Sequence, residues 1–308
     1  MSENQRLDQR IGSYRLQRLL SRSNTVEVYL AEHTLFHTEA VVKILDGHKA
    51  RADDEIEKFL AQASLLTQLQ HPHIVEVSDF GMVEESAFLV MNYAPNGTLR
   101  QRYPKGTCLP LATILRYTRQ IVSALHYIHL HNLIHRDIKP QNMLLGMNDD
   151  VMLTDFGIAV VAQHFDANSP AFRDFEGTAP YAAPEQLQGR PHKNSDLYAL
   201  GIIIYEWLCG GWPFTGTFEE IVHQHLYIPP PFFSEKNVEV PPAIEQVLRQ
   251  LLAKEPEQRF SDAKDFLHAL EQAYQATPAS EIALKLPIRR QFMSPLPFMG
   301  QISIHKAG

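Results

Sequence analysis

Short apolar runs rich in β-branched and aromatic residues dominate the first part of this chain. They occupy residues 14–20, 26–31 and 39–45, and the gaps between them suit hairpins. Two similar runs follow at residues 73–78 and 88–93. Runs of this length and composition predict β-strands. We therefore expect a small β-rich unit that ends near residue 93.

Helical spacing occurs once inside this unit and then governs the rest of the chain. Ile56, Phe59, Ala63, Leu66 and Leu69 recur every three or four positions, which places them on one face of a helix. The same spacing returns from about residue 111 onward. It predicts helices at residues 114–128, 196–209, 218–225, 242–253 and 261–275.

Together the patterns predict an α+β fold with two lobes. The small lobe covers residues 14–93 and the larger helical lobe covers residues 94–273, after a lead of residues 1–13. Residues 274–308 contain scattered prolines and lack helical periodicity. We expect them to form a mostly flexible C-terminal tail with a possible local docking role. From this division of the 308 residues we expect no sensor domain.

Composition and charge exclude several classes of protein. Hydrophobic residues make up 44% of the chain, which is too high for a disordered protein. The net charge of −7 gives no chain-wide basic surface for nucleic acid. Cys108 and Cys209 form no CxxC motif, which argues against a disulfide framework and for a reducing compartment.

No stretch of the sequence is suited to a membrane. The first ten residues are polar and charged, unlike a signal peptide. The longest apolar run covers residues 197–205, whereas a membrane-spanning helix needs about 20 apolar residues. We expect a cytoplasmic protein without a membrane anchor.

Three motifs carry candidate chemistry. The first is His135-Arg136-Asp137 with Lys139 and Asn142, the second is Asp155-Phe156-Gly157, and the third is Ala183-Pro184-Glu185. In this order they resemble the signature of protein kinases. The match is to the eukaryotic-type Ser/Thr kinases of bacteria, over residues 14–273, and it implies the bilobal protein kinase fold.

The resemblance implies a role for each polar residue. Asp137 would accept or orient the proton of a substrate hydroxyl, and Lys139 would stabilise the transferring γ-phosphate. Asn142 and Asp155 would bind Mg²⁺, which prefers oxygen ligands. Lys43 would hold the α- and β-phosphates of ATP. The expected reaction is transfer of the ATP γ-phosphate to Ser or Thr of a protein substrate.

The resemblance also places the nucleotide pocket and the scaffold. Val28 would cover the adenine, Leu144 would lie beneath it, and Met91 would be the gatekeeper. The full predicted set for the nucleotide is Leu20, Val28, Val41, Lys43, Met91, Asn92, Ala94, Leu144 and Asp155, with Asn92 and Ala94 offering backbone groups. Asp196 would anchor the catalytic loop, and Glu185 would form a buried ion pair with Arg259.

The sequence departs from the family at five positions. Ser21, Ser23 and Val26 stand where the family has three glycines that approach the phosphates. Val26 is the hardest to accommodate, because a β-branched residue disfavours a positive φ. Gln62 stands where a helix glutamate normally pairs with the lysine. We expect Gln62 to accept an uncharged hydrogen bond from Lys43.

Val41, where the family usually has alanine, also lies on the N-lobe side of the pocket. Two interpretations stay open at this point. The chain is either an enzyme with reduced activity or a pseudokinase whose fold serves nucleotide binding or protein interaction. A small-molecule kinase is disfavoured by Gly177-Thr178, where Thr178 would shape a peptide-substrate floor.

Regulation gives one further hypothesis. Arg136 before Asp137 is the arrangement that pairs with a phosphorylated activation loop. Between residues 157 and 177 the only hydroxyl side chain is Ser169. Asp174 or Glu176 in the same segment is expected to stand in for a phosphate.

Overall fold

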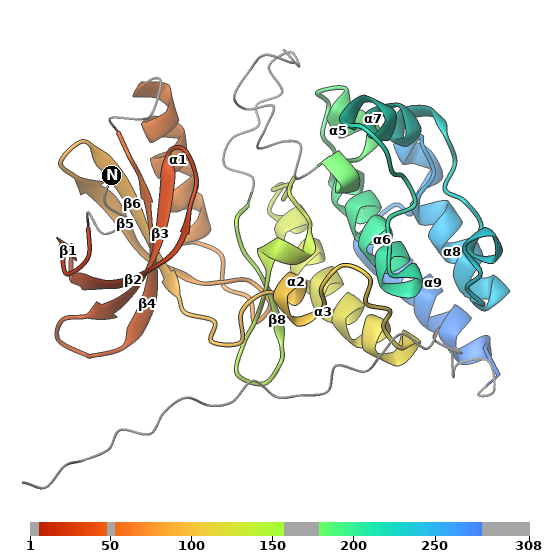
Figure 1. Cartoon of the computed structure of the whole chain (residues 1–308), viewed down its shortest axis with the longest axis horizontal. Coiled ribbons are helices and arrows are strands. Elements are labelled where there is room, and N and C mark those ends of the chain that lie inside the picture. The colour runs from red at the N-terminus through yellow and green to blue at the C-terminus, as the bar shows by residue number, and fades with distance from the viewer. Residues whose placement is uncertain (1–5, 48–52, 157–178, 279–308) are drawn as a thin grey trace, which may run out of the picture.

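An antiparallel sheet and one long helix form the N-terminal lobe of the computed structural model, which describes residues 6–47, 53–156 and 179–278 (Figure 1). The sheet has six strands in the order β1-β2-β3-β4-β6-β5, and α1 packs against β5 and β6. The elements are β1 (Arg10–Ile11), β2 (Tyr14–Arg22), β3 (Val26–His33), β4 (Glu39–Leu45), α1 (Asp53–Leu66), β5 (Val77–Val83) and β6 (Ser86–Asn92).

Alternation along the strands gives this sheet two apolar faces. On β4, Val42 belongs to a cluster on one face, with Tyr29 and Val90. Its neighbour Val41 points to the other face, where Leu89 joins a core that continues into the second lobe. Successive side chains of a strand point to opposite faces, so one strand serves both clusters. The second face is the one that α1 covers.

Helices make up most of the C-terminal lobe, on the other side of Figure 1. Helix α3 lies in its core, with Ile114, Ile121, Leu125 and Ile128 fully buried, and it packs against α6 and α9. The elements are α2 (Leu99–Arg102), α3 (Leu111–Leu130), β7 (Met143–Leu145), β8 (Val151–Leu153), α5 (Pro184–Leu187), α6 (Lys193–Cys209), α7 (Phe218–Tyr227), α8 (Pro242–Leu251) and α9 (Ala263–Ala276), with short 3₁₀ turns at Pro140–Asn142, Ala179–Tyr181, Phe233–Lys236 and Pro256–Gln258.

One glycine sets how closely two of these helices approach. A Cβ at Gly201 of α6 would lie 2.8 Å from Leu252 and 3.0 Å from Leu251. A larger residue at this position would force Leu251 and Leu252 to shift, so glycine lets α6 pack closely on the end of α8. The motif Asp196 to Gly201 therefore combines an anchor for the catalytic loop with a close helix contact.

The bilobal α+β fold is confirmed, but one predicted strand is wrong. Residues 73–75 do not join the N-lobe sheet, and β5 begins only at Val77. Instead, Ile74 bridges Leu153 of β8 in the C-terminal lobe, where Leu153 N donates to His73 O at 2.9 Å and Val75 N donates to Leu153 O at 2.9 Å. Ile74 and Val75 are therefore buried by a contact between the lobes and not by the sheet.

Some predicted features lie outside the described residues. They are Gly157 and Thr178, the activation-segment residues Ser169, Asp174 and Glu176, and the tail beyond residue 278. Within the described part of the chain, no helix has both the length and the apolar character needed to cross a membrane.

Candidate active site

Three polar residues of the loop between α3 and β7 contact one another. Lys139 Nζ lies 2.9 Å from Asp137 Oδ2. The side-chain nitrogen of Asn142 donates to the same Oδ2 at 2.7 Å and to the Asp137 carbonyl oxygen at 2.9 Å. The Asp137 carboxylate is therefore held from two sides while its side chain stays 23% exposed.

A buried carboxylate fixes the start of this loop. Asp196 is 1% exposed. It accepts hydrogen bonds from the backbone N–H groups of His135 and Arg136, both at 2.9 Å, and lies 2.8 Å from His129 Nε2. Arg136 has φ of 67°, a conformation that costs energy for a residue other than glycine. The bonds to Asp196 hold the backbone in this turn.

His135 joins the loop to the strand that carries Asp155. The Asp137 N–H donates to His135 Nδ1 at 3.3 Å, so Nε2 carries the proton and donates to the Thr154 carbonyl at 3.1 Å. Burial lowers the pKa of His135, which agrees with a neutral ring that has one donor and one acceptor. Its ring lies 4.6 Å from that of Phe156.

The two lobes meet at an ion pair. Lys43 is on β4, and Asp155 lies just after β8. Lys43 Nζ is 2.7 Å from Asp155 Oδ1. Burial would raise the pKa of Asp155, but the charge of Lys43 and its hydrogen bond outweigh burial and hold that pKa below its usual value. Asp155 has φ of 55°, a turn that carries its carboxylate toward Lys43.

Gln62 does not bind Lys43, so the expected hydrogen bond between them is wrong. Its side-chain nitrogen donates to the Phe156 carbonyl oxygen at 2.6 Å. Its side-chain oxygen is buried without a hydrogen-bond partner in the described structure. Helix α1 is thus tied to the backbone beside Asp155, and Lys43 takes Asp155 as its partner.

The residues in place of the three glycines form an ordinary hairpin. Ser23 N donates to Val26 O at 2.8 Å, and Val26 N donates to Ser23 Oγ at 3.2 Å. Neither serine nor Val26 has a positive φ, and Val26 is the first residue of β3. The expected conflict between valine and a left-handed backbone therefore does not arise in this conformation.

Most of the predicted adenine-contacting residues lie on neighbouring strands of the N-lobe sheet, whereas Leu144 comes from the separate two-stranded sheet of β7 and β8. Val28 is paired with Lys43 across β3 and β4, and Val41 is paired with Met91 across β4 and β6. Leu144 is on β7, and Leu20 is a 37% exposed residue of β2. Ala94 is buried just beyond β6.

Asn92 has only one backbone group to offer a base. Its N–H donates to Glu76 O at 3.1 Å, and its side-chain nitrogen donates to Glu76 Oε2 at 3.0 Å. The backbone carbonyl is therefore the group that could meet the edge of an adenine.

Comparison with known proteins decides the family. Residues 14–274 match the protein kinase domain model. The chain belongs to this family. It is 30% identical to the serine/threonine-protein kinase PrkC of Bacillus subtilis over 96% of this chain and 46% of PrkC. It is 34% identical to the serine/threonine-protein kinase Pkn1 of Myxococcus xanthus over 86% of this chain and 38% of Pkn1.

A solved structure agrees with this result. The crystal structure of a point mutant of the Mycobacterium tuberculosis PknI kinase domain is similar with a TM-score of 0.68 and 25% identity, over 89% of this chain and 100% of that one. The chain spans less than half the length of the curated relatives named above. The resemblance to eukaryotic-type Ser/Thr kinases is thereby confirmed.

The residues of this kinase domain fit a magnesium-bound nucleotide. Asn142 uses its side-chain nitrogen on Asp137, and Asp155 uses Oδ1 on Lys43. One amide oxygen and one carboxylate oxygen remain. Mg²⁺ is commonly bound through one or two protein oxygens, with waters and substrate phosphates completing its shell. Among the described residues no group of three or more His, Cys, Asp or Glu side chains offers a separate metal site.

The predicted scaffold pair of the kinase domain is present. Arg259 donates to Glu185 through two nitrogens, at 2.7 and 2.8 Å, and Ser195 Oγ adds a bond of 2.6 Å to Glu185. Burial would raise the pKa of Glu185, but the bonds and charge of Arg259 outweigh it and keep that pKa low. Both residues are buried.

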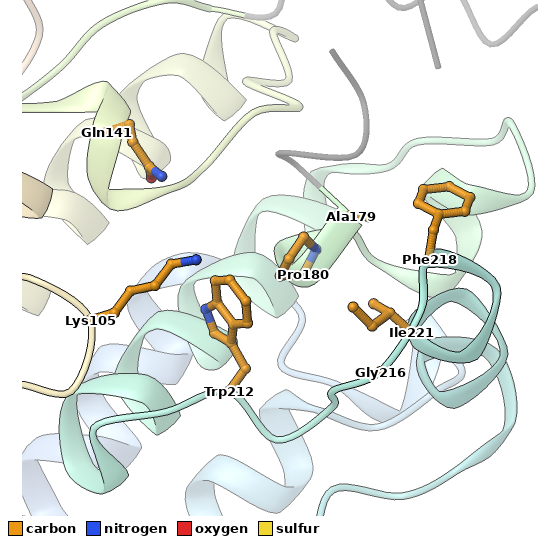
Figure 2. Close-up of a pocket in the computed structure, with 8 residues that line it drawn as sticks. All are labelled: Lys105, Gln141, Ala179, Pro180, Trp212, Gly216, Phe218 and Ile221. Atoms are coloured by element: carbon orange, nitrogen blue, oxygen red, sulfur yellow. The ribbon is translucent and has the colours of Figure 1, made fainter. Parts of the chain in front are cut away.

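Sequence reasoning missed a second pocket in the kinase domain. It has a volume of about 270 Å³ and lies beside the catalytic loop (Figure 2). Its lining residues are Lys105, Gln141, Ala179, Pro180, Trp212, Gly216, Phe218 and Ile221. These residues come from separate stretches of the chain, and no local motif joins them. The aromatic residues near positions 212–218 are the sequence feature that could have indicated it.

Proposed function

We propose that this chain transfers the γ-phosphate of ATP to a serine or threonine hydroxyl of a protein substrate. The observation that carries the proposal is the contact of Asp137 with both Lys139 and Asn142, at 2.9 and 2.7 Å. Phosphoryl transfer depends mainly on positioning and on neutralising charge. The loop supplies both requirements. The Asp137 carboxylate is fixed by its contacts, and Lys139 provides a positive charge beside it.

Each residue then has one task. Asp137 orients the substrate hydroxyl and accepts its proton, and Lys139 stabilises negative charge on the transferred group. Lys43 binds the nucleotide phosphates. Asn142 and Asp155 would hold Mg²⁺, which would neutralise charge on those phosphates. The apolar residues Leu20, Val28, Val41, Met91 and Leu144 enclose the base, with backbone groups of Asn92 and Ala94 at its edge.

The proposal includes the division of the chain into a lead of residues 1–13, a catalytic domain of residues 14–273 and a tail of residues 274–308. It also includes a cytoplasmic location. Cys108 and Cys209 are both unpaired thiols in the described structure, which supports a reducing compartment.

The competing function is a pseudokinase that binds nucleotide without transfer. Gln62 favours it, because Lys43 has no carboxylate from α1 to hold it in place. The contacts around Asp137 favour the enzyme, since a pure binding module has no need for them.

Transfer of labelled phosphate tests the proposal. The protein is incubated with γ-labelled ATP and Mg²⁺, with itself and a generic protein as acceptors, beside Asp155→Ala. We expect transfer by the wild type that exceeds the variant. Equal incorporation at high enzyme concentration would reject the enzyme. A thermal shift with ATP, with and without Mg²⁺, would then show whether the chain binds nucleotide.

A further inference from the structure

The pocket of Figure 2 is lined in part by the catalytic loop, the loop that contains Asp137. Gln141 lines it, and this residue lies between Lys139 and Asn142 in the catalytic loop. A peptide with its acceptor hydroxyl at Asp137 therefore extends past this pocket within a few residues. Apolar residue types complete the lining, with Ala179 and Pro180 on one side and Phe218 and Ile221 from the first turn of α7.

A lysine faces this apolar surface. Figure 2 shows the side chain of Lys105 next to Trp212. Lys105 Nζ lies 4.0 Å from the centre of the Trp212 ring. No carboxylate among the described residues lies within ion-pair distance of Lys105. A lysine ammonium over an indole keeps its charge and stays available on its outer side.

The backbone around Lys105 is fixed by the lobe beneath it. Gly106 N donates to Gly210 O at 2.9 Å, and Leu109 N donates to Trp207 O at 2.7 Å. A Cβ at Gly210 would lie 3.0 Å from Gly106 O, so the two segments are in close contact. The loop that carries Lys105 is thus held against the end of α6.

Trp212 is fixed by a polar network. Its indole N–H donates to Tyr181 OH at 3.1 Å, and that hydroxyl donates to Glu206 at 2.9 Å. Arg100 donates to Tyr181 OH at 2.6 Å and contacts both oxygens of Glu206 at 2.8 Å. The network orients the ring, and it also neutralises the nearest buried acid. The charge of Glu206 is therefore balanced by Arg100 and does not attract a basic substrate.

One more carboxylate lies at the rim. Glu220 is close to Gly216, but it accepts the Thr217 N–H at 2.7 Å as part of the cap of α7. Its charge stabilises the helix N-terminus. Around the part of the pocket that the structure describes, Lys105 is the positive charge without an acidic partner.

We infer that this pocket selects protein substrates that carry an acidic side chain next to an apolar one, close to the phosphoacceptor. Lys105 would bind the carboxylate, and Trp212, Phe218 and Ile221 would contact the apolar side chain. The inference rests on the proposed function, because it concerns protein substrates. What it predicts directly is a preference for binding peptides that carry an acidic side chain.

Peptide binding tests it without any need for catalysis. The test uses two pools of fluorescent peptides with a central threonine and with phenylalanines at the same positions. The pools differ only at their charged positions, which are all Glu in one pool and all Lys in the other. Anisotropy titrations with the full chain give a Kd for each pool. We expect roughly fivefold tighter binding of the Glu pool, the size of one partly exposed ion pair. The net charge of −7 works against this result, so general attraction cannot produce it.

Charge reversal assigns the preference to one residue. We expect Lys105→Glu to abolish or invert the preference, because Lys105 is exposed and its replacement leaves the core intact. Lys264→Glu makes the same charge change on α9 and serves as the matched control, which should keep the wild-type ratio. Trp212→Leu should weaken the binding of both pools.

The outcomes separate this inference from the proposed function. Tighter binding of the Lys pool by the wild type, or equal ratios for Lys105→Glu and Lys264→Glu, would overturn the inference even if phosphate transfer is observed. A Glu-pool preference that depends on Lys105 would support it even if no transfer is detected.

Discussion

Gln62 shows how one side chain changes the partners of its neighbours. An amide can donate to the Phe156 carbonyl at 2.6 Å, whereas an ionised carboxylate cannot. The residue therefore ties α1 to the segment after Asp155 and leaves Lys43 to pair with Asp155. Gln62, where the family has glutamate, therefore changes which residues connect α1, β4 and the segment after β8.

A glutamate in place of Gln62, as is typical of the family, should not increase the rate of phosphate transfer. We expect Gln62→Glu to destabilise the fold by about 1–3 kcal/mol, because a carboxylate would face the Phe156 carbonyl oxygen without a donor. Urea unfolding measures the loss, and Gln62→Met, which removes the polar group, is the control. Higher stability and faster phosphate transfer in Gln62→Glu would contradict this account.

The buried pair of Glu185 and Arg259 acts at the scale of elements. It joins the start of α5 to the turn after α8, and Ser195 connects it to α6. Removal of one partner leaves a buried charge, which costs far more than the pair itself contributes.

We therefore expect Arg259→Leu to lower the free energy of unfolding by about 3–5 kcal/mol. Arg119→Leu is the matched control, since Arg119 pairs with Glu271 at the surface with 52% of its side chain exposed. That control should cost at most about 1 kcal/mol. Similar losses for both variants in denaturant titrations would refute the special role of the buried pair.

Helix α7 carries a buried histidine that makes its packing sensitive to acid. His225 is fully buried, and its Nδ1 lies 3.0 Å from Tyr198 OH. Burial, with help from the nearby charge of Lys254, lowers the pKa of His225 to about 3. The unfolded chain then binds more protons than the folded one between about pH 6.5 and 3, so stability falls as the pH drops through this range.

Melting temperatures across this range test the effect. We expect the wild type to lose stability more steeply below about pH 6.5 than His225→Gln, which keeps a hydrogen-bonding group but does not titrate. His223→Gln changes an exposed histidine of the same helix and should follow the wild type. Parallel curves for wild type and His225→Gln would exclude His225 as the cause.

The sequence predicts elements best where local pattern and burial agree. The strand at residues 39–45 and the helix with Ile114, Ile121 and Leu125 are where the periodicity placed them. The run at residues 73–78 failed because its apolar residues are buried against β8, a contact between lobes that local periodicity cannot show. The pocket of Lys105 and Trp212 was missed for the same reason.

At the scale of the whole molecule, the candidate site exists only where the two lobes meet. Lys43 comes from the sheet and Asp155 from the helical lobe, and their contact spans the boundary. The sequence motifs predicted that Lys43 and Asp155 belong to the site. They could not predict the partners of Lys43 and Gln62, because those contacts depend on the relative position of the two lobes.

A nucleotide that contacts both lobes should stabilise the whole chain. We expect Mg·ATP well above its Kd to raise the melting temperature by several degrees, since binding at about 100 times Kd is worth about 2.7 kcal/mol. Lys43→Met should reduce this shift strongly. An unchanged shift in Lys43→Met would show that the nucleotide binds without the contact to Lys43.

The most direct test of the central claim is the rate of phosphate transfer under single-turnover conditions for the wild type and Asp137→Asn. Lys139 and Asn142 hold the Asp137 carboxylate in place, and asparagine preserves its shape but accepts no proton. We predict a rate that is about 10²–10⁴-fold lower in Asp137→Asn, with unchanged ATP affinity. Equal rates for the two proteins would contradict the assignment of Asp137 and the account built on it.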